Sequence, residues 1–116
     1  MHYLLERRDG RAECRLEGLA LLEGWERILP QIGQATADAG DSTLIIVIEG
    51  LVGFLGTPER QKVGELAAQH LKHLRKVALL VPPQKVTGVT QRAARERGLD
   101  LRVFDDAAQA LDWLAA

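Results

Sequence analysis

The fold is most strongly constrained by five consecutive apolar residues in the middle of the chain, Leu-Ile-Ile-Val-Ile at positions 44–48. Four of the five are β-branched, which is typical of a strand. A strand that is apolar on both faces has to be covered on both faces, as strands are in a parallel sheet packed between helices. We therefore expect residues 44–48 to form the central strand of an α/β sheet.

The start of the chain predicts a β-hairpin. Asp9-Gly10 separates two strand-like runs, at 2–8 and 11–17. Asp-Gly favours a type I′ turn, because that turn needs positive φ at both central residues. In the second run apolar and charged residues alternate, which places Cys14 on the inward face. We expect Cys14 to be a small buried hydrophobe rather than a reactive thiol.

The rest of the chain alternates between helical and strand-like periods. From Leu22 to Ala39 apolar residues recur every three or four positions, which predicts a helix that Gly40 ends and Pro30 kinks or divides. Thr57 and Pro58 predict the start of the next helix, with the threonine hydroxyl at the N-cap and proline at the first helical position. Later segments are expected at 77–81 (strand), 85–97 (helix), 99–103 (strand) and from Asp105 or Asp106 (helix). The predicted order is β-β-α-β-α-β-α-β-α, a mixed sheet whose later strands are parallel.

Length and composition exclude several classes of protein. A chain of 116 residues suits one domain, expected to span 1–116. The formal net charge is −1 with no basic stripe, which argues against nucleic-acid binding. No apolar run approaches the roughly 20 residues of a membrane span. A single cysteine forms no intramolecular disulfide and suits the cytoplasm, where we expect the protein.

No pattern predicts catalysis or a metal centre. His70 and His73 are one helical turn apart but lack a third ligand at a suitable spacing, which favours a structural histidine. Ser42 is the only serine and has no nucleophile-elbow pattern around it. No pair of carboxylates stands out as acid and base. We therefore expect no enzyme activity, no catalytic residue, no metal and no other cofactor.

The candidate site is the turn between the central strand and the next helix. Gly50, Gly53 and Gly56 precede a helix N-terminus, a place that suits anions, but their spacing matches no phosphate-binding motif. The residues between the glycines are apolar, which is unusual for a solvated turn. They form either a lid folded onto the core or an exposed patch for a partner or a lipid-like ligand. These residues are Leu51, Val52, Phe54 and Leu55.

Three segments resemble the STAS domain (sulfate transporter and anti-sigma factor antagonist). They are RLEG at 15–18, IIVIEGLVGFLGTPE at 45–59 and GLDLRVFDDAAQALDWL at 98–114. The last of these is similar to the SpoIIAA-like branch, which is related to STAS and Sec14 proteins. The resemblance covers nearly the whole chain and implies a SpoIIAA-like mixed sheet with an N-terminal hairpin. It also implies that the chain is a binding module.

In anti-sigma factor antagonists, a partner kinase phosphorylates a serine or threonine at the start of the helix after the central strand. The phosphate then switches off binding to that partner. The resemblance places this modification at Thr57, although Gly56 stands where an acidic residue is usual and Pro58 where a small one is. The alternative is that Thr57 is only the N-cap of the helix.

The leading hypothesis is a regulatory domain that binds a kinase, an anti-sigma-like protein or another regulator. Its surface would comprise the apolar turn and, as a polar rim, the helix residues Arg60, Gln61 and Glu65. The alternative is a carrier of a small hydrophobic ligand or lipid, as in Sec14-like proteins, with the turn gating an apolar pocket. The sequence leaves a homodimer open and specifies neither the partner nor the pathway.

Overall fold

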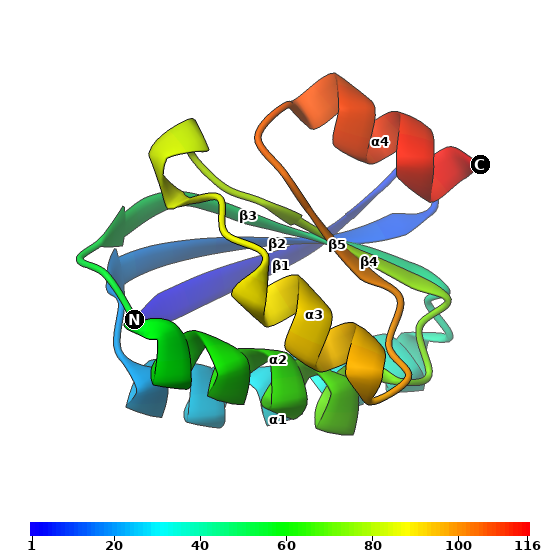
Figure 1. Ribbon diagram of the computed structural model, residues 1–116. Coiled ribbons are helices and arrows are strands. Elements are labelled where there is room, and N and C mark those ends of the chain that lie inside the picture. Colours follow the sequence, from blue (N-terminus) through cyan, green and yellow to red (C-terminus); the bar gives the residue numbers. More distant parts are fainter.

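The computed structural model describes residues 1–116 and contains one five-stranded sheet (Figure 1). The strands lie in the order β1-β2-β3-β4-β5, with β1 antiparallel to β2 and all other neighbours parallel. The strands are β1 (His2–Arg8), β2 (Arg11–Leu19), β3 (Thr43–Val52), β4 (Lys76–Leu80) and β5 (Leu101–Phe104). The helices are α1 (Leu22–Ala39), α2 (Thr57–Leu71), α3 (Val89–Glu96) and α4 (Ala107–Ala115), with a 3₁₀ turn η1 (Pro83–Lys85). The predicted order of elements is confirmed.

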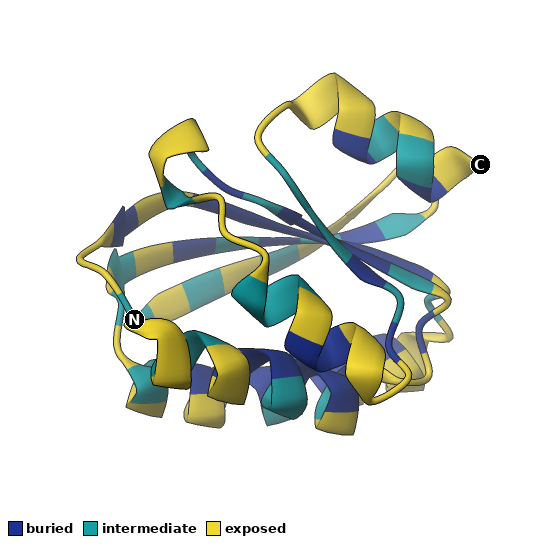
Figure 2. Cartoon of the chain, viewed as in Figure 1, coloured by how far each residue is buried: buried dark blue, intermediate teal, exposed yellow.

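The helices form a layer on each face of the sheet. Helices α1, α2 and α3 cover one face, and α4 covers the other (Figure 1). This arrangement follows from the strand order, because successive right-handed crossovers to the next strand along place their helices on the same side. Ile46 of β3 belongs to the core under the first three helices, and Ile45 to the smaller core under α4. The prediction that β3 is covered on both faces is confirmed (Figure 2).

The N-terminal hairpin has the predicted turn. Asp9 and Gly10 both have positive φ, at 53° and 80°. The pairing places Leu5 opposite Cys14, whose side chain is fully buried. Desolvation raises the pKa of the Cys14 thiol from 9.0 to about 12, so the thiol is neutral and shielded. The expectation of a small buried hydrophobe is confirmed.

Helix α1 has the predicted bounds but is not divided. It runs without interruption through Pro30, which removes one N–H donor from the middle of the helix. The apolar face of the helix, which includes Trp25, Leu29 and Ile32, is buried against the sheet. We attribute the continuity to this packing, which offsets the lost hydrogen bond. Gly40 ends the helix in the left-handed conformation with φ 71°, as expected.

Several element bounds differ from the prediction by one or two residues, and two differ by about four. The third helix begins at Val89 rather than near residue 85, because Pro83 starts a separate 3₁₀ turn and Val86 is extended. Strand β3 continues to Val52, beyond the predicted 44–48. The pairing between β2 and β3 shifts after Leu16 and then runs on to Leu19 opposite Val52, so the second half of β3 still has a hydrogen-bonded neighbour. Part of the predicted turn is therefore strand.

Helix α4 packs on β3, β4 and β5 and leaves the same face of the first two strands uncovered. That open surface is charged: Arg15 lies 3.4 Å from a carboxylate oxygen of Glu13 and 3.5 Å from one of Glu49. Asp106, one of the two predicted starts of the last helix, is the N-cap of α4 and accepts a hydrogen bond from the Gln109 amide at 3.0 Å. None of the helices has the length and hydropathy needed to cross a membrane.

Candidate functional site

A pocket of about 80 Å³, partly open to solvent, lies at the C-terminal edge of the parallel strands. Its walls include Ile48 of β3, Val81 just after β4 and Val103 of β5, together with Trp25 from α1. Nine of the fourteen lining residues are hydrophobic. The carboxyl ends of the strands in an open α/β sheet are the usual place for a ligand. The pocket is therefore the natural candidate for a ligand site in this fold.

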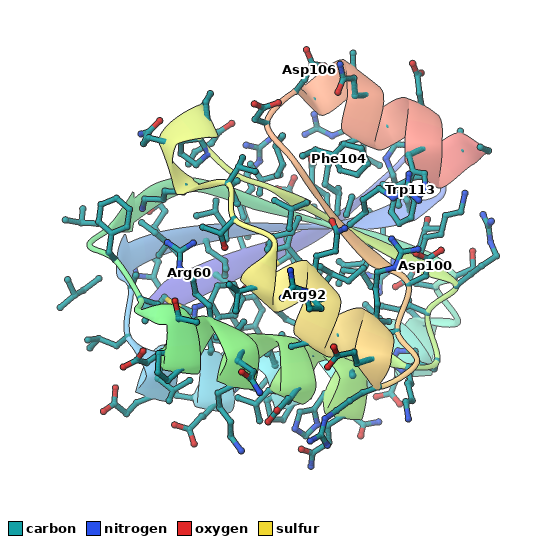
Figure 3. The ribbon with its side chains drawn as sticks, viewed as in Figure 1. Arg60, Arg92, Asp100, Phe104, Asp106 and Trp113 are labelled. Atoms are coloured by element: carbon teal, nitrogen blue, oxygen red, sulfur yellow. The ribbon has the colours of Figure 1, made fainter.

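Two cations, Arg60 and Lys85, line this otherwise apolar pocket. Arg60 Nε donates to the Leu55 carbonyl at 2.8 Å and its Nη1 donates to Thr87 Oγ1 at 2.9 Å. Lys85 Nζ donates to the Leu51 carbonyl at 2.8 Å. In Figure 3 the Arg60 side chain points from the start of α2 toward the strands. These hydrogen bonds tie α2 and the segment after β4 to the end of β3 and the turn that follows it.

Neither cation is neutralised by a carboxylate. None of the ion pairs in the structure involves Arg60 or Lys85, and no acidic residue lines the pocket. All hydrogen-bond acceptors of the two side chains are neutral oxygen atoms. The pocket thus combines apolar walls with two positive charges that have no acidic partner.

Exposed apolar side chains gather beside the pocket. Leu19 lies opposite Val52 in the β2–β3 pairing. Phe54 lies between two lining residues in the chain, and its ring centroid is 5.7 Å from Lys85 Nζ. Val86 likewise follows Lys85 and precedes Thr87. We call this surface the loop patch; it consists of Leu19, Leu21, Val52, Phe54 and Val86.

The four apolar residues of the turn divide between the two interpretations. Val52 and Phe54 are each 69% exposed and belong to the loop patch. Leu51 is buried at 9% and Leu55 is half-buried against the core, and both line the pocket. The expectation of an exposed Leu51 is wrong, because β3 extends through Val52 and successive side chains of a strand point to opposite faces. The segment is therefore both a lid and a patch.

Thr57 is exposed and is the first residue of α2, but it is not the N-cap. Gly56 occupies the N-cap position, and no side chain caps the helix, so the N-cap interpretation of Thr57 is wrong. The Glu59 carboxylate reaches back over Gly56, where an added Cβ would lie 2.8 Å from its Oε2. Pro58 has no N–H to offer an anion. The helix start is thus already occupied by a carboxylate, while the Thr57 hydroxyl makes no hydrogen bond to the helix backbone.

Of the predicted polar rim, only part lies at the surface. Gln61 is exposed, and its amide lies 3.4 Å from a carboxylate oxygen of Glu65, which in turn pairs with Arg97 at 3.6 Å. Arg60 is half-buried and turned into the pocket, so its expected place on the rim is wrong. The reason is local: the Leu55 carbonyl and the Thr87 hydroxyl bind its guanidinium on the inner side of α2.

Sequence reasoning missed the contribution of the segment after β4. Lys85, Thr87 and Thr90 all line the pocket, and Thr90 Oγ1 donates to the Arg60 carbonyl at 3.2 Å. The sequence does carry a signal for this, because parallel strands end at the same edge of a sheet. The residues after β4 were therefore to be expected beside the residues after β3. His73, by contrast, lies apart from the pocket, with its Nε2 2.8 Å from Thr36 Oγ1.

Several solved structures share this fold. The anti-sigma factor antagonist SpoIIAA in its unphosphorylated form has a TM-score of 0.57 and 16% identity, covering 98% of this chain and 96% of its own. An anti-sigma factor antagonist from Mycobacterium paratuberculosis has a TM-score of 0.53 and 20% identity, covering 99% and 94%. An uncharacterised protein from Shewanella loihica PV-4 with a SpoIIAA-like fold has a TM-score of 0.50 and 22% identity, covering 97% and 92%.

No curated protein sequence matches the chain. The SpoIIAA-like family model, however, matches residues 13–115, from the second strand of the hairpin to the end of α4. The matched region includes the whole of the pocket and the loop patch. The chain belongs to the SpoIIAA-like family.

Proposed function

We propose that residues 1–116 form one STAS-like regulatory domain that acts in the cytoplasm by binding a protein partner rather than by catalysis. The loop patch carries this proposal: its apolar side chains are exposed at one edge of the sheet, next to the polar surface of α2. An apolar centre beside a polar rim is the usual anatomy of a protein interface. Two of the structures with this fold are anti-sigma factor antagonists, which by name act on another protein.

We propose that phosphorylation of Thr57 regulates this binding. Its side chain is exposed, it makes no capping hydrogen bond, and it lies three residues after Phe54 of the loop patch. A phosphate adds about two negative charges, which disfavour an apolar contact at close range. Glu59 at the same helix start adds to the negative charge there. Phosphorylated Thr57 therefore weakens partner binding.

Affinity capture with wild type and three variants tests this function. Wild type and Leu4→Asp, whose substitution lies on β1 at another exposed apolar side chain, are expected to capture the same partner. Phe54→Asp and Thr57→Glu are expected to lose it while remaining folded by circular dichroism. Equal capture by all four proteins, or no partner from any of them under several growth conditions, contradicts the proposal.

The pocket supports a second function, the binding of a small apolar molecule. Its volume of about 80 Å³ is nearly three times the roughly 30 Å³ share of one water, and most of its lining is hydrophobic. Native mass spectrometry of gently purified protein tests this proposal. A stoichiometric mass above that of the bare chain supports it, and a bare mass after addition of small apolar compounds contradicts it.

A further inference from the structure

We infer that the pocket binds a small organic carboxylate, with the apolar end of the molecule inside and its carboxylate on Arg60 and Lys85. This inference rests on the second proposed function and adds to it the charge of the ligand. It concerns the pocket alone and does not depend on a protein partner at the loop patch.

The unused donors of the two cations carry the charge argument. A guanidinium has five N–H donors and an ammonium has three. In Arg60, Nε and Nη1 are bound to neutral oxygens, while Nη2 has no protein partner. In Lys85, one of three N–H groups is bound to the Leu51 carbonyl. Both side chains can therefore bind an anion without giving up any hydrogen bond of the folded protein.

The placement of these cations is also preorganised. The Leu55 carbonyl and the Thr87 hydroxyl fix the Arg60 guanidinium from two different segments, so little side-chain freedom is lost on binding. Lys85 is held from the β3 side by Leu51. Charge-assisted hydrogen bonds from arginine to a carboxylate are strong and directional, because the planar fork matches the two oxygens. An acidic ligand supplies the negative charge that no residue of the pocket offers to Arg60 and Lys85.

The volume limits the apolar part of the ligand. A cavity of about 80 Å³ is roughly half of the 150 Å³ that holds a benzene molecule, so only a short chain fits inside. The walls near the strand ends, among them Ile48, Val63 and Val81, are apolar and complement such a chain. A longer ligand extends through the open side toward Phe54 and Val86 of the loop patch. The best fit in both charge and size is therefore a monocarboxylate such as hexanoate, whose chain lies partly in the cavity and partly in its open side.

Titration of the isolated protein with four probes tests the inference, using backbone amide chemical shifts in NMR. The probes are hexanoate, the neutral analogue hexan-1-ol, acetate and inorganic phosphate. Hexanoate is expected to bind most tightly and to shift the amides of pocket residues such as Leu55 and Thr87. Hexan-1-ol and acetate are each expected to bind about tenfold or more weakly, since one lacks the charge and the other the chain.

Variants of the cations supply the second arm. Arg60→Met and Lys85→Met keep a long apolar side chain and remove the charge, and each is expected to weaken hexanoate about tenfold or more with little effect on hexan-1-ol. Lys62→Met is the matched control, because Lys62 is an exposed cation of the same helix that does not line the pocket. Its affinity for hexanoate is expected to equal that of wild type.

The outcomes separate this inference from the function on which it rests. Hexan-1-ol that binds as tightly as hexanoate, or a hexanoate affinity unchanged in both cation variants, overturns the carboxylate inference and leaves a neutral apolar site. Phosphate or acetate that binds as tightly as hexanoate overturns the apolar part. If neither hexanoate nor hexan-1-ol shifts any pocket amide, the ligand function itself fails together with the inference.

Discussion

The contact between α2 and α3 allows a sharp prediction, because it depends on one glycine. Gly64 is buried in the middle of α2. A Cβ added there would overlap the Thr90 carbonyl oxygen and would lie 2.8 Å from Ala93 Cβ and 3.0 Å from the Ala94 amide nitrogen. Two of these three atoms belong to the backbone of α3, so no side-chain rotation relieves the overlap. Gly64→Ala therefore has to push α3 away from α2.

The expected cost follows from two opposing terms. Overpacking a well-packed site costs about 1–3 kcal/mol, and the backbone obstruction places this site toward the upper end. Alanine in place of glycine inside a helix stabilises the folded state by about 1 kcal/mol, because alanine has the higher helix propensity. The net prediction is a loss of about 2 kcal/mol in the free energy of unfolding. For a chain of this length that corresponds to a decrease in Tm on the order of 8 °C.

Urea denaturation followed by tryptophan fluorescence measures this loss, because Trp25 is buried in the folded protein. Gly88→Ala is the matched control: Gly88 has an ordinary φ of −85° and no atom within 4 Å of an added Cβ. Gly88 is the N-cap of α3, where alanine is somewhat poorer than glycine, so the variant is expected to lose no more than about 0.5 kcal/mol of unfolding free energy. If Gly64→Ala is as stable as wild type or more stable, the close approach of α2 and α3 is refuted.

Four further predictions concern single side chains. Asp106→Ala is expected to lower the unfolding free energy by about 1 kcal/mol, because it removes the cap on α4, whereas Thr57→Ala is expected to change it by less than about 0.5 kcal/mol. Urea denaturation of both variants checks this contrast, and an equal loss in the two contradicts it. The unfolding free energy of Phe54→Asp is also expected to lie within about 0.5 kcal/mol of the wild-type value, since the ring is 69% exposed. A larger loss of unfolding free energy would show that Phe54 is part of the core. The pKa of the Cys14 thiol is 9.0 in the unfolded chain and about 12 in the folded protein. The contribution of Cys14 to the unfolding free energy is therefore complete below pH 9.0, and above it this contribution decreases by about 1.4 kcal/mol per pH unit, because the unfolded chain loses its proton first. The difference in unfolding free energy between wild type and Cys14→Ala should therefore shrink as pH rises above 9.0, and a constant difference contradicts the raised pKa.

Local patterns in the sequence predicted most of the fold. The helical period of 22–39 yields the bounds of α1, and Asp9-Gly10 yields the turn of the hairpin, because each is determined by residues close in the chain. The continuity of α1 through Pro30 was not predictable in the same way. It depends on how firmly the buried face of the helix packs against the sheet, which the period of apolar residues does not measure.

The site was harder to predict because it is assembled from distant segments. The sequence singled out the turn after β3, which lies beside the pocket, but which of its side chains are exposed depends on where β3 ends, and that depends on pairing with β2. The inward direction of Arg60 depends on the Thr87 hydroxyl, 27 positions away in the chain. Spacing along the sequence carries no information on such a contact. The pocket therefore becomes visible only when the strand ends are placed side by side.

The agreement between strand order and chain order has a consequence during synthesis on the ribosome. Each new strand joins the edge left by the previous one, so no segment has to insert between strands that have already paired. Domains that emerge from the ribosome begin to fold from the N-terminal side. Helix α4 is made after all five strands, and until it emerges the apolar side chains of Ile45, Val47 and Ala78 have no cover on that face of the sheet. The nascent chain is thus expected to be a chaperone substrate until the nine-residue helix α4 emerges, although the pocket side of the sheet is already covered by then.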